Sequence, residues 1–158
     1  GRDAGALDRA LGAFARESAP VTAPALTLDA ALGFVALRPS GPAAALDAFA
    51  LSVVERFAPF RAPLDPSEIE RRRAAGLTEG QEAALARYGY PHAGPEFRFH
   101  VTLTGPVDPA MATEVIETAR PLVMPHLEPE FRLAEIALFA EPDAGEPFRL
   151  IRRYPLTG

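Results

Sequence analysis

The chain has 158 residues, a net charge of −5 and a pI near 5.2, and it contains no cysteine. Without cysteine it has no disulfide, no thiolate metal ligand and no cysteine nucleophile, which fits a cytoplasmic protein. All 16 basic residues are arginine, so lysine Schiff-base chemistry and a P-loop lysine are excluded as well. The acidic balance argues against an extended nucleic-acid surface, and any phosphate site must therefore be local.

Hydrophobic residues make up 48% and charged residues 23% of the sequence, as in a globular protein. The length is that of one domain, and we expect residues 1–158 to form it. No apolar run approaches the roughly 20 residues of a membrane span, and no signal-peptide pattern opens the sequence, so we expect no membrane partner. The sequence starts at Gly1 in a helical pattern, and this residue need not be the first of the protein.

Hydrophobic periodicity predicts the elements of the first third of the chain. Apolar residues recur at helical spacing over residues 3–17, which predicts a helix that ends near Pro20. Residues 25–29 and 33–38 are short apolar stretches that predict two strands. A second helix is predicted over residues 43–57, where apolar side chains line one side.

Two short polar helices are predicted in the middle of the chain. Residues 65–68 (Asp-Pro-Ser-Glu) are typical of a helix start, and residues 78–81 (Thr-Glu-Gly-Gln) begin another helix that runs to about Arg87. The first of these helices carries three consecutive arginines, residues 71–73. They form either a solvated helix face beside acidic neighbours or a cationic cover over a cleft, in which a guanidinium grips a phosphate with two hydrogen bonds.

The most informative stretch is residues 97–105, Phe-Arg-Phe-His-Val-Thr-Leu-Thr-Gly. Its odd positions are apolar and its even positions are polar, which predicts a strand with one face in a core. Side chains on the polar face would lie about 6.6–7 Å apart, so a cation, an imidazole and two hydroxyls are aligned. Such a row of donors suits an anion with several oxygens, and phosphate is the obvious candidate.

His100 is the one side chain in this row that exchanges a proton near neutral pH, because free imidazole titrates near pH ~6.5. Thr102 would hydrogen-bond a phosphoryl oxygen without adding charge. Arg98 and Thr104 share the same face and are the next candidates for substrate contact, followed by Tyr90 as a stacking or hydroxyl partner at the cleft mouth. The alternative is an ordinary solvated strand face.

The last third of the chain repeats the element order of the first. A helix is predicted over residues 108–124, and strands over residues 130–140 and 147–154. The order strand, helix, strand, strand matches residues 3–38, as though the first unit had lost its opening strand. We therefore expect a pseudo-twofold pair of antiparallel sheets, with a strand upstream of Gly1 that carries a second His-x-Thr motif.

Several segments of the sequence resemble a known family. They are residues 60–63, 71–73, 77–81, 89–91 and, above all, 97–105. Together they look like a bacterial family of proteins associated with phosphonate metabolism, within the two-histidine phosphoesterase superfamily. That superfamily includes the cyclic phosphodiesterases and the RNA 2′,5′-ligase-like enzymes. The resemblance covers about residues 33–156.

The resemblance implies an α+β fold of two lobes, with residues 1–38 in a first repeat, residues 43–96 as a helical connection and residues 97–156 as a second repeat. In the superfamily, two His-x-Thr or His-x-Ser motifs face each other across a cleft. One histidine acts as general base and the other as general acid, without metal or cofactor. Carried over, His100 is one of the two proton-transfer residues and Thr102 is the paired phosphate ligand.

This chain departs from that pattern because it contains no second His-x-Thr or His-x-Ser. His92 is either a turn histidine in solvent or a residue that lines the cleft, and His126 is interpreted as structural, at a helix end. We therefore expect the chain to be incomplete at its N-terminus and to hold half an active site on its own.

The predicted function is that of a metal-independent phosphodiesterase or cyclic phosphodiesterase acting on a small nucleotide or sugar phosphate, with an RNA end as an open alternative substrate. The opposite hypothesis is a non-catalytic phosphate-binding module. A third makes His92 and His100 metal ligands beside Glu96, but zinc-site spacing is lacking. For Arg98 the alternative role is a surface ion pair with Glu96. The oligomeric state is left open.

Overall fold

The computed structural model describes residues 4–143 and 145–158, which form two compact units. The terminal unit contains residues up to Thr22 and residues from Arg132 onward, and the central unit contains Ala23–Phe131. Both units combine helices with antiparallel strands, which confirms the predicted α+β class. The boundary between the units falls within two strands that pair with each other, β1 (Val21–Pro24) and β5 (Glu130–Leu133).

In the terminal unit, one helix packs against a two-stranded hairpin. The helix is α1 (Ala4–Glu17), and the hairpin consists of β6 (Glu135–Ala140) and β7 (Arg149–Pro155). The helix buries Leu11 and Phe14, as its amphipathic pattern predicts.

A polar cluster joins this helix to the hairpin. The buried Tyr154 donates its hydroxyl to Asp8 Oδ1 at 2.7 Å, and Arg152 donates to the same carboxylate at 3.1 Å. The hydrogen bond from Tyr154 is the main cause that lowers the pKa of Asp8 below its usual value, and the charge of Arg152 acts in the same direction. These contacts link α1 to β7 across 146 residues of sequence.

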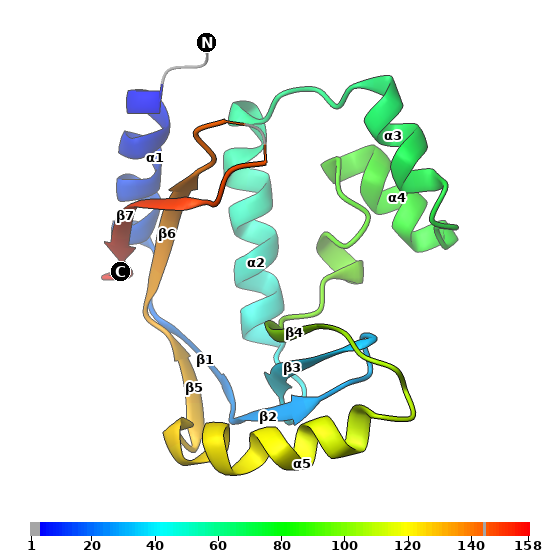
Figure 1. Cartoon of the computed structure of the whole chain (residues 1–158). Coiled ribbons are helices and arrows are strands. Elements are labelled where there is room, and N and C mark those ends of the chain that lie inside the picture. The colour runs from blue at the N-terminus through cyan, green and yellow to red at the C-terminus, as the bar shows by residue number, and fades with distance from the viewer. Residues whose placement is uncertain (1–3, 144) are drawn as a thin grey trace. The chain divides into compact units, whose positions relative to one another are not determined.

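The central unit is built on a three-stranded antiparallel sheet of β2 (Leu26–Asp29), β3 (Phe34–Pro39) and β4 (Val101–Pro106). Figure 1 shows α5 (Ala112–Val123) lying along this sheet. Apolar side chains of the helix, among them those at positions 115, 116, 119 and 123, pack on the buried residues of β2 and β3. The core residues of the two strands are Leu26, Leu28, Val35 and Leu37.

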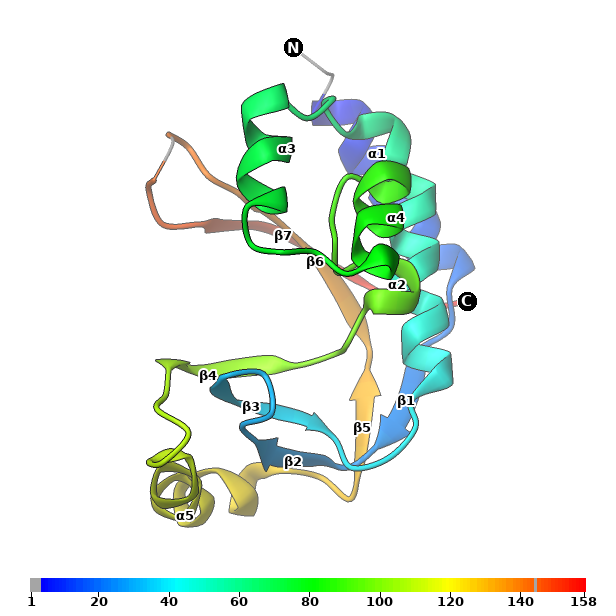
Figure 2. The ribbon, with the colours of Figure 1, turned by 90° about the vertical axis from the view of Figure 1, so that its right-hand side faces the viewer.

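The strand predicted over residues 97–105 begins only at Val101, so the four preceding residues lie outside the sheet. Figure 2 shows β4 along the edge of the sheet beside β3. Because an edge strand is covered less completely, the predicted apolar face is only partly buried. Val101 is 43% and Leu103 is 41% exposed, whereas Phe99 packs against the core.

An irregular register interrupts the pairing of β3 with β4. Ala36 lies opposite Thr102, but Phe34 lies opposite Pro106, so β4 carries extra residues between these pairs. The Thr104 hydroxyl accepts a hydrogen bond from the Val35 backbone N–H at 3.0 Å, which satisfies a donor that the irregular ladder would leave unpaired.

Helices fill the connection between β3 and β4. They are α2 (Ala44–Phe57), α3 (Pro66–Arg73) and α4 (Glu79–Tyr88), with short 3-10 helices at Ala58–Phe60 and Gly94–Glu96, and a third at Met124–His126 after α5. The predicted starts of α3 and α4 are confirmed. Asp65 caps α3 by accepting from the Ser67 backbone N–H, and Thr78 and Gln81 form a capping box on α4.

Glycine is required where α4 ends. Gly89 has φ +70°, a left-handed conformation that closes the helix by a hydrogen bond from its N–H to the Leu85 carbonyl. The guanidinium of Arg61 lies directly against Gly89, since a Cβ atom added there would be 2.9 Å from Arg61 Cζ. Both backbone conformation and space therefore select glycine at this position.

Other predicted boundaries differ from the structure for local reasons. The helix predicted over residues 108–124 starts at Ala112, because Asp108 first forms a turn by accepting from the Ala110 N–H. The stretch predicted as one strand over residues 130–140 is divided into β5 and β6 at Ala134. Strand β1 was not predicted, since prolines at both ends of this short segment weaken the strand pattern.

The described residues repeat an element order, with one more strand in each series than the sequence predicted. Helix α1 is followed by β1, β2 and β3, and helix α5 is followed by β5, β6 and β7. Of these two series, the second is preceded by a strand, β4, which pairs with the hairpin of the first. In the described part of the chain, no helix combines the length and apolar character that crossing a membrane demands.

We expect Tyr154→Phe to reduce the free energy of unfolding most at neutral pH. Folding lowers the pKa of Asp8, so the stabilisation is full above the pKa of an unfolded aspartate, about 3.9, and is lost as pH falls through the lower folded value. Urea unfolding gives the free energy of unfolding of wild type and variant, and their difference should be smaller at pH 2.5 than at pH 7. An equal difference at both pH values would contradict this role for Asp8.

We expect Gly89→Ala to destabilise the protein more than Gly76→Ala. Both glycines have positive φ, so each alanine costs about 1–2 kcal/mol of backbone strain. At Gly76 a Cβ atom meets nothing within 4 Å, whereas at Gly89 it collides with Arg61. Chemical denaturation gives the free energy of unfolding of each variant, and the difference between them is the free energy needed to displace Arg61. Equal decreases in the two variants would show that Arg61 moves away without cost.

Candidate active site

The central unit contains a pocket of about 450 Å³ that brings together several of the predicted site residues. The β2–β3 hairpin supplies two apolar wall residues, Leu32 and Phe34, and the connection from α4 to β4 supplies the other six. These six are Tyr90, His92, Glu96, Phe97, Arg98 and His100. Two histidines and an arginine therefore line one cavity together with the aromatic residues Phe34, Tyr90 and Phe97.

The tautomer of His100 is set by a backbone carbonyl. Its Nδ1 lies 2.8 Å from the Arg98 carbonyl oxygen, and since a carbonyl only accepts, Nδ1 carries the proton. In the neutral ring, Nε2 then holds a free lone pair, which is the state of a general base. The ring packs against Phe34 with centroids 5.4 Å apart, so its orientation is fixed from two sides.

The guanidinium of Arg98 is held by backbone carbonyls. Its Nη1 donates to the Pro95 carbonyl at 2.7 Å and to the Phe97 carbonyl at 2.6 Å. Among the described residues no carboxylate pairs with Arg98, so the ion pair with Glu96 considered from the sequence is not formed. Its positive charge remains available to an anion in the pocket.

Tyr90 is fixed between a histidine and an arginine. Its ring meets the ring of His92 edge-on at 5.5 Å, and Arg72 Cζ lies 5.4 Å from its centroid. Arg72 also donates to the Gly89 carbonyl at 2.8 Å and pairs with Glu68. Arg72 thus supports the wall of the pocket from outside, because it is not among the residues that line it.

The three consecutive arginines form the ion-paired helix face that was one of the two interpretations. Arg71 and Arg72 both contact Glu68, and Arg73 pairs with Glu82. The hydrogen bond from Arg72 lowers the pKa of Glu68. The hydrogen bond from Arg73 lowers the pKa of Glu82 and is also the main cause that raises the pKa of Arg73.

The structure does not bring the two predicted threonines into the pocket lining. Thr102 is exposed and lies opposite Ala36 in the register of β3 and β4. The Thr104 hydroxyl accepts from the Val35 N–H and donates to the Gly105 carbonyl at 2.8 Å. The roles of Thr102 as a phosphate ligand and of Thr104 as a substrate contact remain predictions. The Thr104 hydroxyl is already engaged in two hydrogen bonds to the backbone.

Sequence reasoning left His92 open and missed the two apolar wall residues. Leu32 and Phe34 belong to a hairpin whose apolar pattern indicates a core, so nothing in the sequence indicates a pocket wall. For His92 the available signal is its position eight residues before His100, in a segment anchored by the buried Pro91 and Ala93. His126 lies in the 3-10 helix after α5 and does not line this pocket.

Within the described residues, no group of three or more histidine, aspartate or glutamate side chains is arranged to hold a metal ion. The interpretation of His92 and His100 as ligands beside Glu96 therefore finds no support in the geometry.

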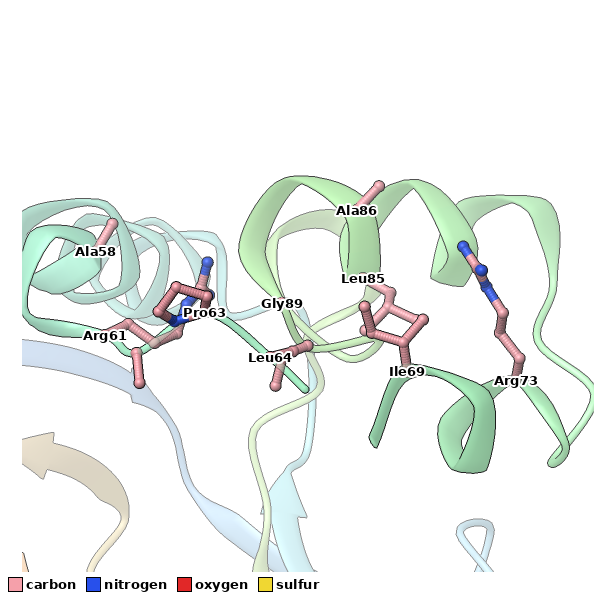
Figure 3. Close-up of a pocket in the computed structure, with 10 residues that line it drawn as sticks. Ala58, Arg61, Pro63, Leu64, Ile69, Arg73, Leu85, Ala86 and Gly89 are labelled. Carbon is pink, nitrogen blue, oxygen red and sulfur yellow. The ribbon is translucent and has the colours of Figure 1, made fainter. Parts of the chain in front are cut away.

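A second pocket of about 370 Å³ is lined by residues between Ala58 and Arg73 and by Leu85, Ala86 and Gly89 (Figure 3). Its floor consists of apolar residues that include Leu64, Ile69 and Leu85, with Arg61 and Arg73 at opposite ends. Arg73 is paired with Glu82, and no histidine is among the described residues that line this pocket. It offers no proton-transfer group near neutral pH, so we place the candidate active site in the first pocket.

Comparison with known proteins gives one family and one relative. Residues 1–149 match the family described as "Protein of unknown function (DUF1045)". The chain is 36% identical over 132 residues to a protein of Janthinobacterium sp. (strain Marseille) named ribose 1,5-bisphosphate phosphokinase PhnN. This match covers 80% of the chain but 29% of the relative. No solved structure matches the chain significantly.

Since the family match extends over nearly the whole chain, including the entire candidate active site, the protein belongs to the DUF1045 family.

Proposed function

We propose that this pocket hydrolyses a small phosphodiester, with a cyclic phosphate of a sugar or nucleotide as the favoured substrate. The observation that carries the proposal is the pairing of His100 with Arg98. Nδ1 of the imidazole donates to a carbonyl, so Nε2 is left as a base, and Arg98, which pairs with no carboxylate among the described residues, lines the same cavity. The proposal includes membership of the two-histidine phosphoesterase superfamily and a place in phosphonate metabolism.

In the proposed reaction, the phosphate group lies against Arg98, which neutralises charge on its non-bridging oxygens. His100 Nε2 takes a proton from water as the water oxygen attacks phosphorus. The bond from phosphorus to the leaving oxygen breaks, and that oxygen takes up a proton from solvent, so a phosphomonoester and a free hydroxyl result. Tyr90 and Phe34 provide flat walls for the sugar or base of the substrate.

The name of the relative supports a ribose phosphate ester as substrate. Its printed activity concerns ribose 1,5-bisphosphate, and the chain covers less than a third of that protein. We do not transfer the kinase activity, because this chain has no lysine and so lacks the lysine that P-loop kinases place on phosphates. A diesterase that opens a cyclic ribose phosphate would yield a ribose phosphate monoester.

The second candidate function is that of a phosphate-binding module without turnover. It is favoured by the single His-x-Thr motif of the sequence, since the second motif that would complete the proton-transfer pair is not in this chain, whereas Arg98 still offers a cation in the pocket. Binding of inorganic phosphate without hydrolysis of any cyclic ester would support it.

We expect His100→Gln to reduce kcat for hydrolysis of 2′,3′-cyclic AMP by at least about 100-fold, because general base catalysis is removed. The assay is product formation by the full-length protein with EDTA present. His126→Gln, outside the pocket, is the matched control and should keep full activity. If the wild type turns over and His100→Gln retains its rate, His100 is not the base.

We expect Thr102→Val to lower kcat/KM by roughly 10- to 100-fold if its hydroxyl binds a phosphoryl oxygen in the complex, since a hydrogen bond to a charged group is lost. Thr102→Ser keeps the hydroxyl and should retain most activity. Thermal melting of both variants controls for the fold. Equal activity of the valine and serine variants would remove Thr102 from the site.

A further inference from the structure

We propose that Arg72 is a positioning residue of the candidate active site, which holds the Tyr90 ring so that the pocket prefers phosphate esters that carry an aromatic base. This inference rests on the proposed function and deepens it, because it selects a nucleotide over a base-free sugar phosphate as the substrate. It gives one of the three consecutive arginines, residues 71–73, a role in the site, although none of the three lines the pocket.

The Arg72 guanidinium contacts the Tyr90 ring from outside the pocket. Its Cζ atom is 5.4 Å from the ring centroid, within the roughly 6 Å range of a cation–π interaction, and Tyr90 lines the pocket whereas Arg72 does not. The Tyr90 ring also meets the His92 ring edge-on, with centroids 5.5 Å apart. Since Tyr90 is 52% exposed, burial in a core does not fix its ring, and these two contacts take that role.

The guanidinium of Arg72 is itself held by three hydrogen bonds. Nη1 donates to the Gly89 carbonyl at 2.8 Å, and Nε and Nη2 donate to Glu68 Oε1 at 3.0 and 2.8 Å. The Arg72 and Glu68 side chains are 24% and 26% exposed, so solvent screens this ion pair less than one at the open surface. The hydrogen bond from Arg72 lowers the pKa of Glu68, so the pair stays charged near neutral pH. Arg72 therefore presents a fixed cation to Tyr90.

The two arginines beside Arg72 do not make these contacts. Arg71 pairs with Glu68 and is 75% exposed, and Arg73 pairs with Glu82 and is 55% exposed. Neither of their guanidinium groups lies over an aromatic ring in the described part of the chain. Consecutive residues of a helix project about 100° apart, so adjacent side chains cannot share one contact surface. Arg71 is therefore a matched control for Arg72, because it shares the Glu68 partner but not the ring.

A fixed Tyr90 ring favours a substrate that has a ring of its own. The faces of an aromatic ring are negative, and a cation on one side balances part of that charge, which makes the ring a better stacking partner for an electron-rich base. Because the ring is held before the substrate binds, stacking costs little additional side-chain entropy. Phe34 and Phe97 line the same cavity. A base-free sugar phosphate contacts Arg98 equally well but gains nothing from these rings.

The experiment compares two cyclic phosphates that differ in the base. 2′,3′-cyclic AMP carries adenine, and methyl β-D-ribofuranoside 2,3-cyclic phosphate has the same cyclic ester without a base. We expect Arg72→Met in the full-length protein to raise KM for the nucleotide by about 5- to 20-fold, the range of a cation–π contact, and to change kcat by less than about 2-fold. KM for the base-free ester should change by less than about 2-fold, and Arg71→Gln should leave both substrates unaffected.

Two further variants separate positioning of the ring from a general effect on the fold. Arg72→Lys keeps a cation near the ring and should recover part of the affinity for the nucleotide. Tyr90→Leu removes the ring, so adding Arg72→Met to it should raise KM for the nucleotide no further. Thermal melting shows whether each variant is folded. If Arg72→Met does not fold, a rise in KM of Arg72→Lys that is confined to the nucleotide supports the role.

The opposite results are equally clear. Equal rises in KM on both substrates, or an effect of Arg72→Met that persists beside Tyr90→Leu, would overturn the role of Arg72 and leave the proposed hydrolysis intact.

Absence of any turnover by the wild type would overturn the proposed function, and the role of Arg72 is then tested by binding. Calorimetry with adenosine 2′-monophosphate and with inorganic phosphate takes the place of the kinetic assay. We expect Arg72→Met to weaken binding of the nucleotide by about 5- to 20-fold and to leave phosphate binding unchanged. Equal weakening of both ligands, or a wild type that does not prefer the nucleotide to phosphate, would overturn this inference as well.

Discussion

The hydrogen bond from His100 Nδ1 to the Arg98 carbonyl depends on where β4 begins. Because residues 97–100 lie outside the sheet, the Arg98 carbonyl is not used by a neighbouring strand and accepts from the imidazole instead. The same segment bends so that the Arg98 guanidinium reaches carbonyls at positions 95 and 97. Had the strand started at Phe97, the backbone carbonyls of this segment would accept hydrogen bonds from the neighbouring strand. The His100 ring would then lack the carbonyl that fixes its tautomer.

A second constraint is the turn at Gly89, where contacts from both pockets meet. The Arg61 guanidinium occupies the space that a Cβ atom at Gly89 would need, and Arg72 donates to the Gly89 carbonyl. The next residue, Tyr90, lines the candidate active site. The left-handed conformation ends α4 and sends the chain into the segment that carries His92. Substitutions at Gly89 would therefore shift Tyr90 and His92, although Gly89 does not line that pocket. Such a shift would change KM indirectly.

Local signals in the sequence predicted local structure well. The caps at Asp65 and Thr78 were predicted because each side chain bonds a backbone group two or three residues away. The alternating pattern around His100 predicted that Arg98 and His100 share a strand face. Both residues line one pocket, but the strand starts only after them, and its start depends on the partner strand β3. Thr104 was interpreted as a substrate contact because it lies on the polar face of the alternating pattern. The pattern does not predict the irregular register, in which the Thr104 hydroxyl accepts from the Val35 N–H.

The remaining residues of the pocket illustrate why a site is harder to predict than a fold. Phe34 belongs to an apolar strand run, and such a run indicates a core regardless of which face a side chain occupies. His92 stands in a turn, where no periodicity relates it to His100. Both line the pocket in a connection that includes the left-handed Gly89 and the buried Ala93. The positions of these pocket residues therefore depend on an irregular segment held by arginines. Arg72 contacts the Tyr90 ring and donates to the Gly89 carbonyl without lining the pocket itself.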